Sequence, residues 1–180
     1  MKILIVFESM FGNTERLARE IADGLAQDGN QPVLLDVRDV RPDDLVGSDL
    51  LVVGAPTHAF SLSRPSTRED AVRQGADPSR ATLGVREWLE SLDAARLPAG
   101  RPRVAVFDSR VDKVRRLPGS AAKRAAKTLR TRGFDLLDRP VSFYVADVQG
   151  PPSPGELDRA HEWGTHLFRL VRSRQHQSAP

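Results

Sequence analysis

The chain has 180 residues, of which 39% are hydrophobic and 28% are charged, values typical of a folded globular protein of one domain. It contains no cysteine, which excludes disulfides, thiolate nucleophiles, cysteine-bound zinc and iron–sulfur clusters, so any redox chemistry requires a bound cofactor. The net charge of +3 is uneven: residues 1–60 carry 5 Lys or Arg against 10 Asp or Glu, and residues 101–140 carry 12 against 4.

The chain has no sequence feature of a membrane protein. No apolar run approaches the roughly 18 residues that cross a bilayer. The opening MKILIVF is short and strand-like, unlike a signal peptide. We therefore expect a cytoplasmic protein, in which the basic stretch is a solvated helix face or, alternatively, attracts an acidic partner.

Five short apolar runs predict five strands. The first, Ile3–Phe7, is rich in branched residues and has no polar alternation, which indicates a strand that is buried on both faces of a parallel sheet. The other four runs are residues 32–37, 50–54, 103–107 and 140–145.

Helical patterns alternate with these strands. Apolar residues at three-and-four spacing between Leu17 and Leu25, with Gly29 just beyond, predict the first helix. Further helices are expected over residues 85–92, 119–133 and 155–171. The alternation predicts a doubly wound α/β fold, a three-layer sandwich around a five-stranded parallel sheet.

The domain organisation is predicted to be simple. We expect one domain over residues 1–172, because neither a linker nor an internal repeat interrupts the pattern. Residues 61–84 are polar and contain Pro, Ser and Gly, and are expected to be an insertion after the third strand. The polar residues 173–180 are expected to be a tail.

The carboxyl ends of the strands are the expected location of a ligand. In the loop after the first strand, a helix start supplies unpaired N–H groups and a partial positive charge. Gly12 permits close approach, and Ser9, Asn13 and Thr14 supply polar donors, which favours a phosphate site. The alternative is that Asn13 or Thr14 only caps the helix.

Two further loops should join this site. In the loop after the third strand, His58 and Phe60 can place rings against a planar group, or can be a solvated side chain and a core residue respectively. After the fourth strand, Ser109 and Arg110 can pair with polar or anionic groups.

The stretches ESMFGNTE, VVGAPTHAF and VAVFDSR, at the ends of the first, third and fourth strands, resemble the three cofactor loops of the flavodoxin family. The resemblance extends over nearly the whole chain and implies a flavodoxin-like fold that binds FMN. It assigns the phosphate to Ser9, Met10, Phe11, Gly12, Asn13 and Thr14. It assigns the two sides of the flavin ring to Pro56, Thr57, His58, Ala59 and Phe60, and to Asp108, Ser109 and Arg110. Phe11 stands where the family usually has a second Thr, which leaves only its N–H for the phosphate.

The resemblance implies an electron-transfer protein that passes electrons between a reductase and an acceptor protein, with no catalytic or metal-binding residue assigned. An alternative is an FMN-dependent NAD(P)H:quinone-type reductase, in which His58 donates a proton. No separate NAD(P)H site is recognisable, which favours the carrier. A second alternative is a flavin-free binding protein that uses the basic helix at residues 120–132 on nucleic acid.

Overall fold

The computed structural model describes residues 1–92 and 101–177, with side chains described up to residue 173. Its sheet has five strands in the order β2-β1-β3-β4-β5, and every neighbouring pair is parallel. The strands are β1 (Ile3–Phe7), β2 (Val33–Asp36), β3 (Leu50–Pro56), β4 (Arg103–Val111) and β5 (Val141–Val145). The predicted doubly wound, five-stranded parallel sheet is confirmed.

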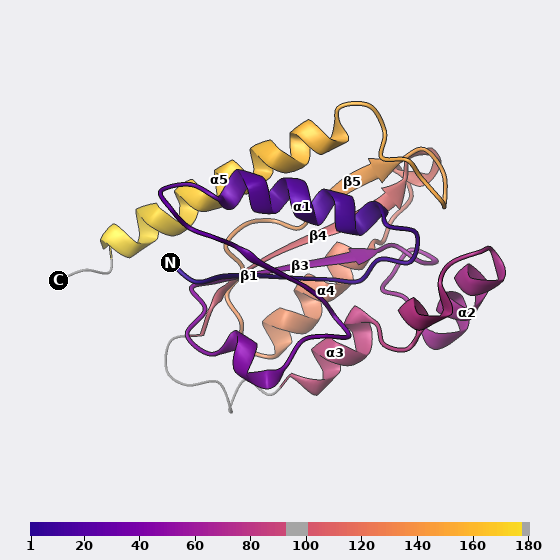
Figure 1. Ribbon diagram of the computed structural model, residues 1–180, viewed down its shortest axis with the longest axis horizontal. Coiled ribbons are helices and arrows are strands. Elements are labelled where there is room, and N and C mark those ends of the chain that lie inside the picture. Colours follow the sequence, from indigo (N-terminus) through magenta and orange to yellow (C-terminus); the bar gives the residue numbers. More distant parts are fainter. Residues whose placement is uncertain (93–100, 178–180) are drawn as a thin grey trace.

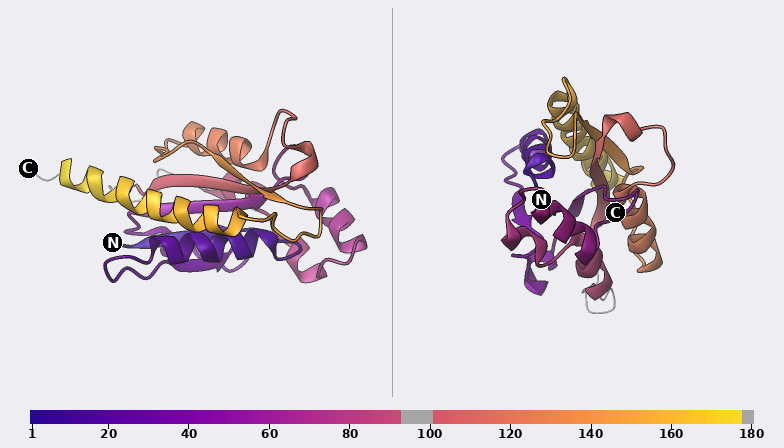
Figure 2. Two further views of the ribbon diagram at one scale, coloured as in Figure 1. Left: turned by 90° about the horizontal axis from the view of Figure 1, so that it is seen from above. Right: turned by 90° about the vertical axis from the view of Figure 1, so that its right-hand side faces the viewer.

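Helices cover both faces of the sheet (Figures 1 and 2). Helices α1 (Asn13–Leu25) and α5 (Glu156–Gln177) pack on one face, and α3 (Val85–Ser91) and α4 (Ala121–Thr131) pack on the other. Helix α2 (Pro65–Arg73) lies beyond the carboxyl ends of the strands. Short 3-10 helices span Pro42–Leu45, Pro78–Ala81 and Asp112–Val114.

Strand alternation divides the core into two layers. Ile3, Ile5 and Phe7 point toward α1 and α5, whereas Leu4 and Val6 point toward α3 and α4. These five side chains are at most 6% exposed, because both faces of a parallel sheet are covered. The continuous apolar pattern of β1 therefore has the physical origin that the sequence indicated.

Helices α1 and α5 approach each other closely at two glycines. A Cβ atom added to Gly24 would lie 2.1 Å from the carbonyl oxygen of His161, and one added to Gly164 would lie 2.3 Å from that of Ile21. Only glycine permits this backbone contact. The contact fixes α1, and with it the loop that precedes α1, against the rest of the domain.

The strand order places a crevice at the carboxyl edge of β1 and β3. The chain leaves β1 toward α1 on one face and leaves β3 toward α3 on the other, so the two loops diverge there. Such a reversal point is the usual ligand position in open α/β sheets.

Three elements extend beyond their expected bounds. Strand β4 continues to Val111 instead of ending at residue 107, and the insertion at 61–84 contains α2. Pro65 occupies the first position of α2, where its missing N–H costs nothing. Helix α5 continues to Gln177 instead of ending at residue 171, because no Gly or Pro interrupts residues 172–177. The rest of the expected tail, 178–180, lies outside the described residues. No described helix meets the length and hydropathy needed to span a membrane.

Candidate functional site

The loop before α1 exposes a run of unpaired amide groups. Within the described part of the chain, none of the five consecutive N–H groups from Met10 to Thr14 donates a hydrogen bond. Gly12 allows this geometry because it adopts a left-handed conformation, with φ of 85°, directly before the helix. The loop therefore presents several donors at the positive end of α1, which suits an anion.

The polar side chains of this loop are buried and organised. The Thr14 Oγ1 lies 2.8 Å from the Oγ of Ser109, which ties the loop to β4. The Ser9 Oγ accepts a hydrogen bond at 3.3 Å from the N–H of Glu15, in the first turn of α1. Gly12 is the residue at the helix cap and no side chain caps there, so the alternative that Asn13 or Thr14 only caps the helix is wrong.

A cavity of about 320 Å³ lies beside this loop, at the carboxyl edge of the sheet. Its walls come from the loops after β1, β3 and β5, from the end of β4 and from α2. The predicted site residues on its surface are Ser9, Met10, Phe11, Asn13, Thr14, Pro56, Thr57, His58, Ala59 and Ser109. The sequence analysis placed all of these at the site, whereas Gly12, Phe60, Asp108 and Arg110 do not line the cavity.

The extension of β4 explains why Asp108 and Arg110 are elsewhere. Alternate residues of a strand face opposite sides, so Ser109 and Val111 face the cavity while Asp108 and Arg110 face away. The carboxylate of Asp108 is fully buried and accepts hydrogen bonds from the Thr57 Oγ1 at 3.0 Å and from the first turn of α4 at 2.8 Å. The expectation that Asp108 borders a bound ring is thereby corrected.

Arg110 also has a structural role. Its side chain is 4% exposed, and its guanidinium donates to the carbonyl oxygens of Val114 and Leu117, the latter at 2.6 Å. These two bonds hold the loop after β4 in place. Arg110 therefore fixes a loop near the cavity and does not border the cavity itself, contrary to the expectation from the sequence.

The turn after β3 is tight and conformationally unusual. Ala59 and Phe60 both have positive φ angles, 46° and 64°, and backbone hydrogen bonds between His58 and Ser61 at 2.9 and 3.0 Å close the turn. Residues with a Cβ atom seldom adopt this conformation, and such turns often occur at functional sites. Phe60 projects outward with 44% of its surface exposed, which corrects the expectation that it covers a bound ring.

His58 lines the cavity in its neutral form. Burial lowers the pKa of its imidazole below the usual 6.5, and the positive charge of Arg68 acts in the same direction. A hydrogen bond to the backbone of Thr67 opposes this change without reversing it. The ring is therefore neutral near pH 7 and is anchored to α2.

Helix α2 supplies a wall that the sequence analysis missed. Thr67, Asp70, Ala71 and Gln74 line the cavity and share one helical face, since they stand at positions i, i+3, i+4 and i+7. Ala71 also packs against the buried side chain of Met10. The spacing was visible in the sequence, but it has meaning only once residues 65–73 are known to be helical.

Three valines complete the cavity and were also missed. They are Val111, Val145 and Val148, from the ends of β4 and β5 and the following loop. The longer β4 brings Val111 to the carboxyl edge, and β5 lies beside it in the sheet. The sequence alone did not place the last strand at this site.

A buried polar cluster anchors the insertion behind the cavity. The side chain of Arg68 is 2% exposed and donates to the Ser63 Oγ at 2.9 Å and to both carboxylate oxygens of Glu87 at 3.2 Å. The neighbouring Glu8 accepts a hydrogen bond at 2.8 Å from the N–H of Val85. Burial raises the pKa of the Glu8 carboxyl above its usual 4.5 despite these hydrogen bonds and the charge of Arg68. The cluster fixes α2 and α3 to the end of β1.

Comparison with known proteins identifies the sequence signature. Residues 5–72 match the flavodoxin family model. A flavodoxin from Clostridium beijerinckii is 40% identical over 70 residues, which make up 39% of this chain and 51% of that protein. The chain thus spans about half the length of this curated relative. The matched part contains β1 to β3 and the first two cofactor-loop motifs.

Solved structures extend the likeness to the rest of the fold. A flavodoxin from the domain Archaea has a TM-score of 0.68 at 20% identity and covers 96% of this chain and 99% of its own. Flavodoxin 1 from Bacillus cereus has a TM-score of 0.64 at 20% identity and covers 94% and 98%. The flavodiiron protein from Giardia intestinalis matches 99% of this chain with 38% of its own, at 18% identity and a TM-score of 0.62. With its sequence signature over residues 5–72 and this fold over nearly all of its length, the chain belongs to the flavodoxin family.

Proposed function

We propose that the cavity binds FMN and that the protein carries electrons between redox partner proteins. The observation that supports this most directly is the run of five unpaired N–H groups from Met10 to Thr14, at the start of α1 and beside the cavity. A phosphate dianion satisfies such donors and is stabilised by the helix dipole. A neutral ligand would leave most of them unpaired.

The side chains around the loop fit the same group. Ser9, Asn13 and Thr14 line the cavity and supply hydroxyl and amide donors for phosphate oxygens. The apolar walls from Val111 and Val145 suit a flat ring system and exclude water from it. When bound, FMN supplies reversible electron transfer, and the protein supplies its position and surroundings.

The turn after β3 offers polar groups to the ring edge. Within the described residues, the N–H groups of Ala59 and Phe60 donate no hydrogen bond, because the turn is closed by His58 and Ser61 alone. Such amides suit the heteroatoms of a flavin. The proposal also includes a cytoplasmic location and partner proteins, a reductase and an acceptor, whose identities are open.

Flavin release and titration test this proposal. The purified protein is expected to be yellow, to release FMN on denaturation, and to bind FMN as apoprotein far more tightly than riboflavin, which lacks the phosphate. A colourless protein whose apoprotein binds FMN and riboflavin equally would contradict the role of the α1 loop.

A second candidate is an FMN-dependent NAD(P)H:quinone-type reductase. It is favoured by the cavity wall from α2, in which Thr67, Asp70 and Gln74 provide polar groups beyond those of the three cofactor loops. His58, neutral near pH 7, lies on the same surface as a group that can exchange protons. Steady NAD(P)H oxidation with a quinone, in the absence of any partner protein, would favour this enzyme over the carrier.

The flavin-free alternative has less support. The apolar side of α4 is buried in the core through Ala122, Ala125, Ala126 and Leu129, so packing alone explains this helix. A need for nucleic acid does not follow from it.

A further inference from the structure

The chain segment beside the cavity mouth is strongly cationic. Residues 112–132 contain eight Lys or Arg and one Asp. They form the loop after β4 and helix α4. We call the exposed cations of this segment the basic rim, which consists of Lys113, Arg115, Arg116, Lys123, Arg124, Lys127 and Arg130.

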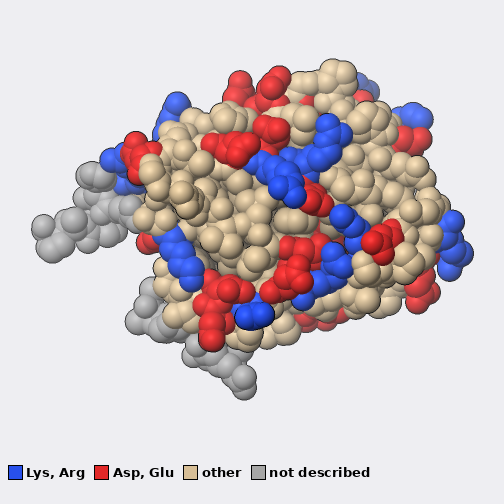
Figure 3. All heavy atoms as spheres, viewed as in Figure 1, with Lys and Arg blue, Asp and Glu red and all other residues tan. Residues whose placement is uncertain are grey.

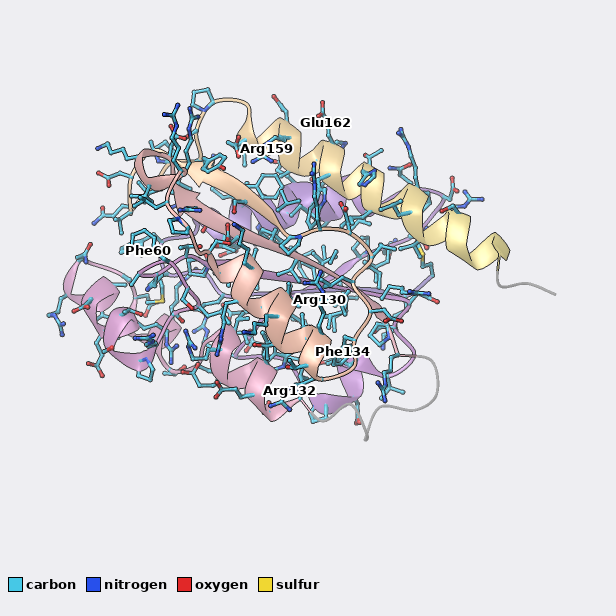
Figure 4. The ribbon with its side chains drawn as sticks, turned by 180° about the vertical axis from the view of Figure 1, so that it is seen from behind. Phe60, Arg130, Arg132, Phe134, Arg159 and Glu162 are labelled. Atoms are coloured by element: carbon cyan, nitrogen blue, oxygen red, sulfur yellow. The ribbon has the colours of Figure 1, made fainter. Side chains whose placement is uncertain are left out.

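Packing of α4 directs its charges outward. The alanines of α4 and Leu129 are at most 1% exposed against the sheet and α3, so the four basic residues occupy the opposite side. Among the described residues, Lys123, Arg124, Lys127 and Arg130 make no ion pair, and α4 itself contains no acidic residue. Figure 4 shows Arg130 on α4 in the view from behind. By contrast, the face in Figure 3 carries Lys and Arg next to Asp and Glu.

Cations from two further elements adjoin the amino end of α4. Burial lowers the pKa of Arg86 on α3, and the positive charges of Arg64 and Arg124 lower it further. Three guanidinium groups from different elements therefore lie close enough to repel one another. Such repulsion is relieved when an anionic surface binds.

The same region exposes apolar side chains. Of the five large hydrophobic side chains that are exposed in the described residues, Phe60, Leu117 and Val148 follow β3, β4 and β5, at the carboxyl edge of the sheet. They are 44%, 47% and 49% exposed, and Val148 lines the cavity. The backbone of Phe60 contacts Gly119, just before α4, and Figure 4 shows Phe60 beyond the amino end of that helix. Apolar groups and cations thus adjoin at the cavity mouth.

We propose that this surface docks an acidic protein, whose carboxylates contact the basic rim and whose apolar centre covers Phe60 and Leu117. The inference rests on the proposed electron-carrier function, since docking here brings the partner's redox centre to the mouth of the cofactor cavity. An apolar centre with a charged border is typical of a protein interface. A nucleic acid would use the cations but would leave Phe60 and Leu117 without a matching surface.

The test measures binding of an acidic [2Fe–2S] ferredoxin by titration calorimetry. The FMN content of the protein is determined in the same preparation. The variant Lys123→Glu/Lys127→Glu reverses two exposed charges of α4, and Arg169→Glu is the control on the exposed side of α5, away from the cavity. We expect affinity to fall at least about tenfold in the α4 variant, less than about twofold in the control, and steeply with added salt in the wild type.

Further arms separate the alternatives. Phe60→Ala is expected to weaken ferredoxin binding without changing its salt dependence, because it removes apolar contact and no charge. Tighter binding to basic cytochrome c, equal binding by the α4 variant and the wild type, or tighter binding to a DNA duplex would each overturn the inference. A protein that contains FMN and fails to bind ferredoxin refutes only the docking surface. One that lacks FMN and binds ferredoxin through α4 refutes only the carrier function.

Discussion

Replacing Thr14 with Val isolates one contact of the proposed phosphate site. The two side chains have nearly the same shape and differ in one hydroxyl group. In the structure this side chain is 1% exposed and its Oγ1 lies 2.8 Å from the Ser109 Oγ, so Val fills the same space without a new cavity. The substitution therefore changes hydrogen bonding and leaves packing intact.

The expected magnitude follows from the charge of the ligand. A hydrogen bond to a charged group contributes about 1.5–3 kcal/mol, which corresponds to a factor of roughly 10 to 150 in the dissociation constant. The Thr14→Val apoprotein should bind FMN more weakly by about that factor, while its affinity for riboflavin changes less than about threefold. Loss of the bond to Ser109 should also lower the free energy of unfolding by about 1 kcal/mol.

The assay is fluorescence-quenching titration of the apoprotein with FMN and with riboflavin. The ratio of the two affinities is the readout, because partial misfolding would weaken both ligands alike. Thr131→Val on α4 is the matched control, since its hydroxyl donates to a carbonyl oxygen of its own helix on the exposed surface. If Thr14→Val lowered both affinities equally, the phosphate would not be bound at the start of α1.

Three further predictions concern stability, each measured by urea unfolding. The folded state binds the Glu8 proton more tightly than the unfolded state, because burial raises the pKa of this carboxyl above 4.5; its contribution to stability therefore falls as pH rises from 4.5 through the raised pKa. Glu8→Gln should flatten this dependence, and a slope equal to that of the wild type would exclude burial as its cause. Gly24→Ala should destabilise by about 2 kcal/mol or more, since its Cβ would lie 2.1 Å from a backbone oxygen of α5, while the exposed Asp23→Ala stays near the wild type; equal stability of both would contradict the close helix contact. Asp108→Ala should cost roughly 3 kcal/mol through two lost hydrogen bonds, far more than Asp112→Ala on the exposed loop, and a cost below about 1 kcal/mol would return Asp108 to the list of ligand contacts.

Local sequence patterns determined most of the architecture. The apolar run Ile3–Phe7 agrees with the bounds of β1, and the alternation of strands and helices gave the class of fold. These features are predictable because burial of both faces of a parallel sheet leaves a continuous apolar run. The first loop was recognisable for a similar reason, since Gly12 and its polar neighbours act within a few residues of one another.

The remaining side of the site depended on where strands end. Asp108, Ser109 and Arg110 read as a turn in the sequence, but hydrogen bonding to β3 and β5 extends β4 to Val111. Pairing with neighbouring strands is a tertiary property. It turns Ser109 toward the cavity and Asp108 and Arg110 away from it.

What the sequence by itself determined is therefore the order of elements and the anion-binding character of the α1 loop, because both arise from interactions between residues close in the chain. The tertiary structure alone decided that α2 and the end of β5 close the cavity, that Phe60 faces solvent, and that the basic rim adjoins exposed apolar groups. These features depend on contacts between segments tens of residues apart, and no local spacing encodes them.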